Sequence, residues 1–465
     1  MAGFFSWLPT ILLGAFFVLG AGANAHLLFF KGRKVKEGEH RPSLVPLVPG
    51  VLGMAACLAS PSDVLRSWAW IPLLLDVGCA PYLLLAFIAL TAEWLRARFR
   101  GKGPVDPGPN AEGYPLAASI QGCLIGTAVG DALGLPMEGL SKRRQQRMFR
   151  VLKPYSFILG RGMCSDDIEH TVMVAQALIA SGGDPDRFGR SLGWRFRFWL
   201  LGLPAGIGSA TLRAILKLWI GFPPAKSGVR SAGNGPAMRS AILGVCYGDR
   251  EDRLRELVRL CTRITHTDPR GEAGALAVAV AADFAARSGT GVSAQAYVDK
   301  LRAYLEEGNE MAGLASRVGE SIGRGEKTEG FAAALGCENG VSGFVNHTVP
   351  VALHAWLSHP QDLESALVTA IRCGGDTDTV AAIVGGIVGA GVGIASIPEP
   401  FRRRLIERPR SVTWLQELGR HLAATVQSQT PGTPVRVSIP VLFLRNLLFL
   451  VLVLLHGFRR LFPPY

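Results

Sequence analysis

Long runs without charged residues stand near both ends of the chain. Residues 3–30 carry no charge, and residues 439–458 are mostly Leu, Val and Phe, interrupted by Arg445. Residues 68–92 form a third run, with Asp76 inside it. A helix of roughly 20 apolar residues is long enough to cross the hydrocarbon core of a bilayer. The pattern therefore predicts membrane helices before residue 102 and one hydrophobic helix at the C-terminal end.

A fourth uncharged run, residues 42–62, is a weaker candidate because it contains four prolines. Basic residues follow the first and third N-terminal runs, whereas the short loop after 42–62 has only Arg66 against Asp63. Lys and Arg accumulate on the cytoplasmic side of membrane proteins. We therefore expect residues 1–102 to be a membrane region with three spans near 3–30, 42–62 and 68–92. The N-terminus is then outside the cell, and the chain after the third span is in the cytoplasm. The membrane is expected to be a bacterial inner membrane.

Three points about these segments stay open. Residues 438–465 have basic residues on both sides, so the sequence does not decide between a transmembrane and an interfacial helix. Residues 23–25 resemble a signal-peptide cleavage site, although no Lys or Arg precedes them. Asp76 is either a functional acid within the membrane or an acid at a helix-packing seam.

The middle of the chain has a different pattern. Residues 103–114 and 427–437 are rich in Pro, Gly or Thr and read as linkers. Between them, residues 115–426 show apolar positions at helical spacing and few alternating strand patterns, as in Leu254, Leu257, Val258 and Cys261. Residues 379–398 are uncharged but rich in Gly and Ala, so we expect a buried core helix there. The prediction is an all-α, compact helical domain.

Composition narrows the function classes. The 465 residues include 49% hydrophobic and 18% charged residues, with a net charge of +13. No zinc-finger, RNA-binding or basic-zipper pattern accompanies the positive charge, so sequence-specific nucleic-acid binding is not expected, whereas anionic lipid is a suitable partner. The eight cysteines form no CxxC pair, which is typical of reduced thiols in a cytosol.

Two short segments carry acids just before apolar, helix-like stretches. The first contains Ser165, Asp166 and Asp167, and the second contains Asp376, Asp378 and Thr379. Helix capping explains each segment alone, and Asp166 with Glu169 even has the spacing of a capping box. However, one helix needs one cap, and neighbouring carboxylates repel unless a cation neutralises them. Acids and hydroxyls from two helix starts are enough for two Mg²⁺ or Mn²⁺ ions.

Three further segments contain candidate functional residues. Gly130-Asp131-Ala132-Leu133-Gly134 is followed by Glu138, and a turn is the simpler explanation of the glycines. A glycine-rich loop places backbone N–H groups where a phosphate can bind, or it is an ordinary loop; it contains Gly233, Asn234, Gly235, Met238 and Arg239. His266 follows a helix end, where a histidine is commonly structural.

In this order the segments resemble the ADP-ribosylglycohydrolase family, over about residues 122–394. The motifs are GCLIGTAVGDALGLPME, SDDIEHT, GNGPAMR, THTDP and GGDTDTVAAIVGGIVGA. The resemblance implies an all-helical fold with two divalent metal ions in a central cleft. One departure is Ile168, where the family often has Thr. A larger departure is the membrane region, which typical members lack.

The resemblance also implies roles for the candidate residues. Metal ligands would be Ser165, Asp166, Asp167, Asp376, Asp378 and Thr379. Glu138 and Asp167 would be catalytic, with Glu138 moving a proton. Substrate-binding residues would be Gly233, Asn234, Gly235, Met238, Arg239 and His266.

The sequence therefore predicts a membrane-anchored two-metal hydrolase that removes ADP-ribose from a modified protein or a small-molecule acceptor. Two alternatives remain: a membrane receptor or scaffold that binds ADP-ribose without cleaving it, and an immunity factor that reverses the action of an ADP-ribosylating toxin. A transporter is poorly supported, since the apolar segments are few and contain one acid.

Overall fold

The computed structural model describes residues 2–29, 47–76, 78–79, 115–149, 155–289, 291–460 and 462–463. All regular elements in these residues are helices, joined in places by isolated bridges between loops. The all-α prediction is confirmed. Residues 80–114, which include most of the predicted third span and the first linker, lie outside the described residues.

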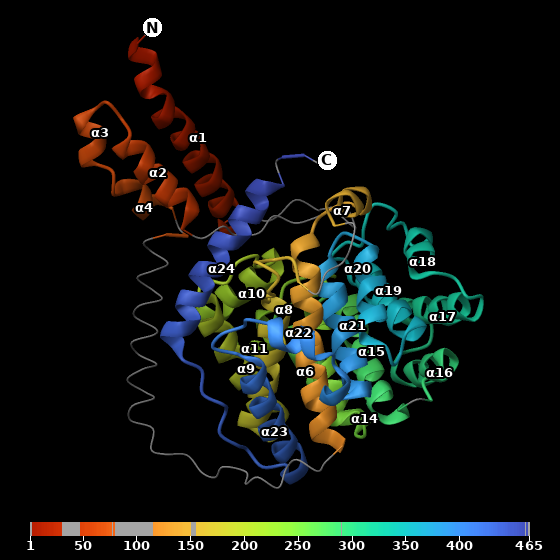
Figure 1. Cartoon of the computed structure of the whole chain (residues 1–465). Coiled ribbons are helices and arrows are strands. Elements are labelled where there is room, and N and C mark those ends of the chain that lie inside the picture. Colours follow the sequence, from red (N-terminus) through yellow and green to blue (C-terminus); the bar gives the residue numbers. More distant parts are fainter. Residues whose placement is uncertain are drawn as a thin grey trace.

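The helices form a small N-terminal group and a large domain (Figure 1). The N-terminal group consists of α1 (Ala2–Phe29), α2 (Val48–Leu58), α3 (Asp63–Ser67) and α4 (Ile71–Leu75). The large domain consists of α6 (Pro115–Gly134), the 3-10 helix η2 (Leu135–Met137), α7 (Lys142–Met148), α8 (Asp166–Ser181), α9 (Pro185–Leu201), α10 (Ser209–Trp219), α11 (Pro224–Ser227), α12 (Gly235–Met238), α13 (Ala241–Tyr247), α14 (Glu251–Arg263), α15 (Pro269–Ser288), α16 (Ala294–Tyr304), α17 (Glu310–Gly323), α18 (Thr328–Ala334), α19 (Val345–Ser358), α20 (Leu363–Arg372), α21 (Thr377–Val392), the 3-10 helix η3 (Ile394–Ser396), α22 (Glu399–Arg404) and α23 (Val412–Ser428). The last helix is α24 (Ile439–Arg459).

Asp76 holds the N-terminal group together. Its carboxylate accepts hydrogen bonds from the Asn24 side chain of α1, at 3.2 Å, and from the backbone N–H of Gly50 in α2, at 3.0 Å. The acid is fully buried among these helices. It therefore lies at a helix-packing seam, which was one of the two expectations for this residue.

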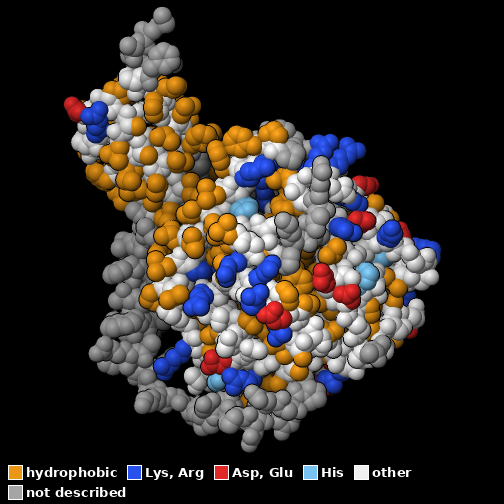
Figure 2. Space-filling model, in the orientation of Figure 1, with side chains coloured by type: hydrophobic (Ala, Val, Ile, Leu, Met, Phe, Trp, Pro, Cys, Tyr) orange, Lys and Arg blue, Asp and Glu red, His pale blue; other side chains and the backbone are white. Residues whose placement is uncertain are grey.

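Three described helices are long and apolar enough to cross a membrane, judged by length and composition only: α1, a stretch containing α6, and α24. Helix α2 has 11 residues, fewer than the roughly 20 that a span requires. The α6 stretch is mostly buried inside the large domain, so its apolar character serves the core. Helix α1 instead exposes apolar side chains between Trp7 and Leu19, within the N-terminal group whose surface is largely hydrophobic in Figure 2.

The centre of the large domain is the antiparallel pair of α6 and α21. Glycines at every fourth position of α6 face the backbone of α21, and a Cβ at Gly122, Gly126 or Gly130 would lie 2.0 Å from a carbonyl oxygen of that helix. Only glycine permits this approach. Helix α21 is buried, as predicted for the Gly- and Ala-rich run 379–398, but it ends at Val392 and most of the last residues of the run are half-buried or exposed. The close packing brings the C-terminal end of α6 to the N-terminal end of α21.

We expect Gly126→Ala to destabilise the protein by about 3 kcal/mol or more, because the added methyl group forces two helix backbones apart. Gly313→Ala is the matched control, since a Cβ there meets nothing within 4 Å. Alanine in that helix should stabilise by roughly 0.5–1 kcal/mol. Thermal unfolding of the purified full chain compares the two. Equal unfolding temperatures would contradict the packing argument.

Candidate active site

The two predicted acid segments meet in space. Helix α8 begins at Asp166, directly after Ser165, and α21 begins at Thr377, directly after Asp376. The backbone N–H of Gly139 donates to the carbonyl oxygen of Gly375 at 2.8 Å, which ties the segment after η2 to the start of α21. The tertiary structure thus gathers residues near positions 131–138, 165–167 and 376–379 into one site.

Asp167 links the two helix starts. Its Oδ2 accepts hydrogen bonds from Ser165 Oγ at 3.1 Å and from Thr379 Oγ1 of α21 at 3.4 Å. Its Oδ1 is buried and has no hydrogen-bond partner, and the same is true of Oδ1 of Asp378. A buried carboxylate oxygen without a partner is costly, so each of these atoms needs a further ligand or a proton.

Asp131 of α6 was not among the predicted site residues, although its motif was noted. Its carboxylate accepts from the backbone N–H of Ser165 at 2.8 Å and of Ile168 at 3.2 Å. It therefore fixes the turn that carries Ser165, Asp166 and Asp167. The signal in the sequence was an acid between two glycines. Its structural role, accepting hydrogen bonds from the start of α8, is visible only in the contact between α6 and α8.

Burial and mutual repulsion control the ionisation of these acids. Burial raises the pKa of Asp131 to about 7, against the lowering effect of its backbone hydrogen bonds. Burial, followed by repulsion from neighbouring acids, raises the pKa of Asp166, Asp167 and Asp378 well above the usual range of aspartate. Glu138 is among the charges that raise the pKa of Asp166 and Asp378. A nearby cation would remove this repulsion.

Capping explains only part of the pattern. Ser165 caps α8, accepting from the backbone N–H of Asp167. Asp376 makes no side-chain cap at α21; its Oδ2 accepts from Asn234 Nδ2 at 2.7 Å instead. The capping-box spacing of Glu169 is also misleading, because its carboxylate accepts from Trp199 and Arg410, both at 2.6 Å. Several acids at these helix starts therefore have no capping role.

The predicted glycine-rich loop reaches the site through Asn234. Besides its bond to Asp376, the Asn234 side chain donates to Thr348 Oγ1 at 3.0 Å. The His266 ring packs beneath the loop: a Cβ at Gly233 or Gly235 would approach it to 3.2 or 3.1 Å. A side chain at either glycine would crowd the His266 ring, and the loop and His266 form one unit next to the second acid segment.

Arg239 and Met238 are placed differently. The Arg239 guanidinium is fully buried, donates to the Cys261 carbonyl at 2.9 Å and lies over the Phe196 ring. The Met238 side chain is also buried, and its carbonyl accepts from Thr171 Oγ1 at 3.3 Å. The hydrogen bonds of the Arg239 guanidinium in the described structure go to Cys261, Thr265 and His170, so direct contact of Arg239 or Met238 with a ligand stays a prediction.

Glu138 follows η2 and is half-buried at the rim of the acids. Arg460, directly after α24, donates to the Pro136 carbonyl at 3.1 Å. Burial lowers the pKa of Arg460, and the charges of Glu138 and Asp378 oppose that effect. A cation from the C-terminal helix therefore stands beside the site, which the sequence did not indicate.

The residues present suit hard divalent cations in their chemistry. Carboxylate and hydroxyl oxygens are the ligands that Mg²⁺ and Mn²⁺ prefer, and two buried carboxylate oxygens lack partners. In the described part of the chain, no three His, Cys, Asp or Glu side chains converge closely enough to hold a metal ion.

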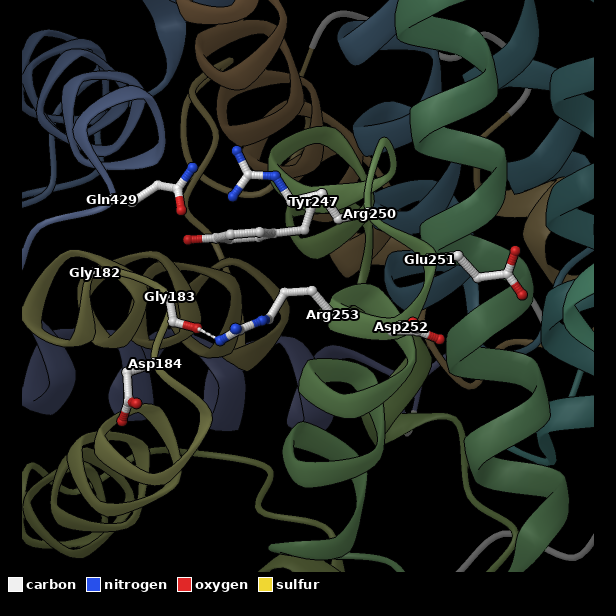
Figure 3. A pocket seen from close by; sticks show the side chains of 9 residues that line it. All are labelled: Gly182, Gly183, Asp184, Tyr247, Arg250, Glu251, Asp252, Arg253 and Gln429. Atoms are coloured by element: carbon white, nitrogen blue, oxygen red, sulfur yellow. Dashed lines mark hydrogen bonds between the residues drawn. The ribbon is translucent and has the colours of Figure 1, made fainter.

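A separate pocket of about 700 Å³ lies at the other end of α8 (Figure 3). Gly183, Tyr247, Arg250 and Gln429 are among its lining residues. The Arg253 side chain donates to the Gly183 carbonyl at 2.7 Å and is thereby fixed to the wall. The pocket contains none of the predicted site residues, and α8 separates it from the acids by about 24 Å at 1.5 Å per residue.

The raised pKa values predict how stability depends on pH and metal. Without metal, folded Asp131 binds a proton below about pH 7, whereas the unfolded chain does so only near 3.8. Stability should therefore rise as pH falls from about 8 to about 5. Added Mg²⁺ should stabilise the full chain most near pH 8, because Mg²⁺ binds the acids in their ionised form. Thermal unfolding in EDTA and in Mg²⁺ checks this; identical pH slopes would contradict a metal site.

These features define an all-helical protein with a buried carboxylate site at two helix starts. The chain belongs to the ADP-ribosylglycohydrolase family, whose model matches residues 113–432. A protein of Archaeoglobus fulgidus is 31% identical over 314 residues, covering 66% of this chain and 96% of that protein. ADP-ribosylhydrolase ARH3 of Bos taurus is 27% identical over 340 residues, covering 61% and 87%.

Two further comparisons support the same family. The ADP-ribosyl-dinitrogen-reductase glycohydrolase of Rhodospirillum rubrum is 24% identical over 289 residues, covering 61% of this chain and 89% of that protein. A solved structure described as an ADP-ribosylglycohydrolase-related protein complex aligns with a TM-score of 0.50 and 26% identity, covering 67% of this chain and 99% of that chain. The predicted family is thereby confirmed. The family supports a glycohydrolase that removes ADP-ribose by hydrolysis.

Proposed function

We propose that this chain is a membrane-anchored, divalent-metal-dependent hydrolase that cleaves the glycosidic bond between ADP-ribose and a modified acceptor. The observation that carries the proposal is the meeting of two acid-bearing helix starts at Asp167, with unpartnered buried oxygens on Asp167 and Asp378. A buried group of acids that raise one another's pKa values is well suited to cations.

Six residues are the proposed ligands of two Mg²⁺ or Mn²⁺ ions: Ser165, Asp166, Asp167, Asp376, Asp378 and Thr379. Bound ions of this kind act as Lewis acids and lower the pKa of a bound water. Asp131 holds the first ligand turn through two backbone N–H groups, and Asn234 orients Asp376. Such supporting contacts keep ligands in place and tune the site.

Glu138 is the proposed proton-transfer group. It stands at the rim and interacts electrostatically with Asp166 and Asp378. In glycoside hydrolysis one carboxyl group donates a proton to the leaving group, and another stabilises the oxocarbenium-like transition state. Glu138 has the first role in our proposal, and Asp167 contributes to the second.

The membrane anchor rests on composition. Helices α1 and α24 have the length and hydropathy of membrane helices. With the basic loops after residues 30 and 95, α1 and the apolar run at residues 68–92 support a multi-pass protein of a bacterial inner membrane with its catalytic domain in the cytoplasm. Its acceptors are then ADP-ribosylated proteins or small molecules that reach the cytoplasmic face.

The experiment is release of ADP-ribose from ADP-ribosyl-arginine and ADP-ribosyl-serine peptides by the purified full chain. We expect release with Mg²⁺ or Mn²⁺ and none in EDTA. Release that EDTA does not affect would remove the metals from the proposal. Metal-dependent binding of ADP-ribose without release from either peptide would instead support the receptor or scaffold.

Glu138→Gln separates catalysis from binding. The amide keeps the shape of the side chain but cannot transfer the proton, so we expect kcat to fall by roughly 100- to 10,000-fold. Binding of ADP-ribose, measured by calorimetry with metal present, should change little. Glu329→Gln, at a half-buried position in α18, is the control. Unchanged kcat in Glu138→Gln would assign the proton transfer to another group.

A further inference from the structure

Most polar residues of helix α24, and Arg460 directly after it, contact the large domain. Arg445 and Asn446 are buried against the large domain, and Asn446 Nδ2 donates to the Gly202 carbonyl at 2.5 Å. Ten residues further on, almost three turns, His456 Nε2 lies 2.7 Å from the Phe157 carbonyl, and its ring stacks on Phe157. Arg460 ends the series at Pro136. The contacts extend over about 22 Å of helix.

The opposite side of α24 is apolar and exposed. Apart from Gly457 and Arg459, every exposed residue of this helix is apolar: Pro440, Val441, Leu444, Leu447, Leu448, Val451, Leu454, Leu455 and Phe458. A helix on a protein in water has the reverse arrangement, with its apolar stripe toward the core. Figure 2 shows the resulting band of hydrophobic side chains over this part of the surface. So large a patch needs an apolar covering.

A neighbouring turn adds to the same surface. Residues 158–161 form a tight turn, and its Leu159 has a positive φ of 47° and a side chain that is 98% exposed. Phe157, just before the turn, packs in one cluster with Phe449 and Leu450 of α24. An exposed leucine in the left-handed region at the tip of a turn gains nothing in water, whereas it inserts readily into lipid.

Basic residues border the apolar surface at the C-terminal end of α24. Lys142, Arg143, Arg144 and Arg147 lie on α7, and the Arg144 side chain donates to the backbone carbonyl of Arg460. Arg459 is exposed beside them. Apolar side chains next to clustered Lys and Arg are the signature of a surface that binds anionic lipid headgroups with its cations and acyl chains with its apolar residues.

We propose that α24 does not cross the membrane but lies in the plane of the bilayer surface. The face that carries Arg445 stays packed on the large domain, the exposed apolar face enters the lipid, and the basic residues of α7 contact anionic headgroups. A spanning α24 would have to leave the domain and carry Arg445 into hydrocarbon, where an arginine costs up to about 2.5–3.5 kcal/mol on insertion scales. It would also strip Glu407 of its Arg445 partner.

This arrangement has a consequence for the acid site. The family match ends at residue 432, so α24 is an addition to the matched domain. Its end, Arg460, stands beside Glu138 and Asp378. The lipid-binding surface therefore ends at the rim of the site, and the bilayer surface and the site are adjacent.

Topology labelling of the full chain in proteoliposomes tests the proposal. In a Cys57→Ser background, Ser438→Cys and Phe462→Cys place exposed thiols at the two ends of α24. An in-plane helix leaves both thiols on one side, so a membrane-impermeant maleimide added to that side should label both equally. Labelling from opposite sides would mean a spanning helix and would overturn the proposal.

Depth measurements extend the test to the lipid contact. A fluorophore on cysteine at Leu444, Leu448, Val451 or Leu455 should be quenched by brominated lipid to a similar, shallow extent, and Arg259→Cys on exposed α14 should not be quenched. Quenching that peaks in mid-helix would indicate a spanning helix. No quenching at any position, or cross-linking of these cysteines between two copies of the chain, would show that lipid does not cover this face. Each result would contradict the lipid assignment. Phosphatidylglycerol, an anionic lipid, should increase the quenching, and Arg143→Glu should reduce that increase. Quenching that does not depend on phosphatidylglycerol would mean that α7 is not part of the lipid-binding surface.

Discussion

Asp378→Asn is expected to lower kcat for metal-dependent ADP-ribose release by about 1000-fold, corresponding to about 4 kcal/mol of lost transition-state stabilisation. The amide has nearly the volume of the carboxylate but no charge, and Asp378 Oδ1 is one of the two unpartnered buried oxygens at the site. Initial rates with ADP-ribosyl peptides, over a range of Mg²⁺ concentrations, measure the effect.

Stability should move in the opposite direction. Burial and neighbouring acids raise the pKa of Asp378, so the metal-free fold disfavours its charge, and asparagine should leave the unfolding temperature in EDTA unchanged or higher. Asp299→Asn, at an exposed position of α16, is the matched control and should change neither activity nor stability. Activity of Asp378→Asn within tenfold of the parent would rule out Asp378 as a metal ligand.

Arg445→Met is expected to destabilise the protein by about 3–5 kcal/mol, because it leaves the buried acid Glu407 without its cation and Glu169 with Arg410 alone. Arg445 Nη2 lies 2.8 Å from Glu407 Oε2, and Nη1 lies 3.5 Å from Glu169 Oε1. Burial raises the pKa of Glu169, but attraction by Arg410 and Arg445, together with hydrogen bonds from Trp199 and Arg410, outweighs this effect and lowers the pKa. That stabilisation is present at neutral pH and is lost as pH falls through the lowered pKa.

The same substitution should also weaken the acid site. Arg445 Nη2 donates to the Cys164 carbonyl at 2.5 Å, and the Cys164 N–H donates to Glu407, directly before the Ser165 turn. Thermal unfolding and the Mg²⁺ dependence of activity, both on the full chain in detergent, measure the two effects. Arg459→Met, an exposed arginine on the same helix, should change stability by less than about 0.5 kcal/mol. Equal effects of the two substitutions would contradict the network.

A double substitution separates loss of charge from loss of packing. In Arg445→Met with Glu407→Leu, the arginine and the acid it leaves behind are both removed, and the stability should recover in part. A double variant as unstable as the sum of the single variants would mean that the ion pair is not the source of the effect.

The sequence by itself determined the fold class, the family and the composition of the site. Helical spacing predicted an all-α domain, and the ordered motifs predicted the family that the comparisons confirm. The acid segments could be recognised because acids directly before an apolar helix form a local pattern, which is visible without knowledge of the tertiary structure. Their roles as ligands, and the boundaries of the membrane region and the linkers, stay predictions.

Only the tertiary structure decided which residues act together. Asp131 is an unremarkable acid until the glycine face of α6 packs on α21 and the α6–α8 contact brings it to the Ser165 backbone. Arg239 looks like a ligand-binding residue in its motif, yet its guanidinium is bonded within the core.

The same holds for the C-terminal helix. Its hydropathy reads as a membrane span, and the sequence left spanning and interfacial placement open. The structure adds information that a hydropathy average loses: Arg445, Asn446, His456 and Arg460 all contact the large domain, through partners 38 to 324 positions away in the chain. A local pattern determines which residues avoid water, but long-range contacts decide what each face of a helix meets.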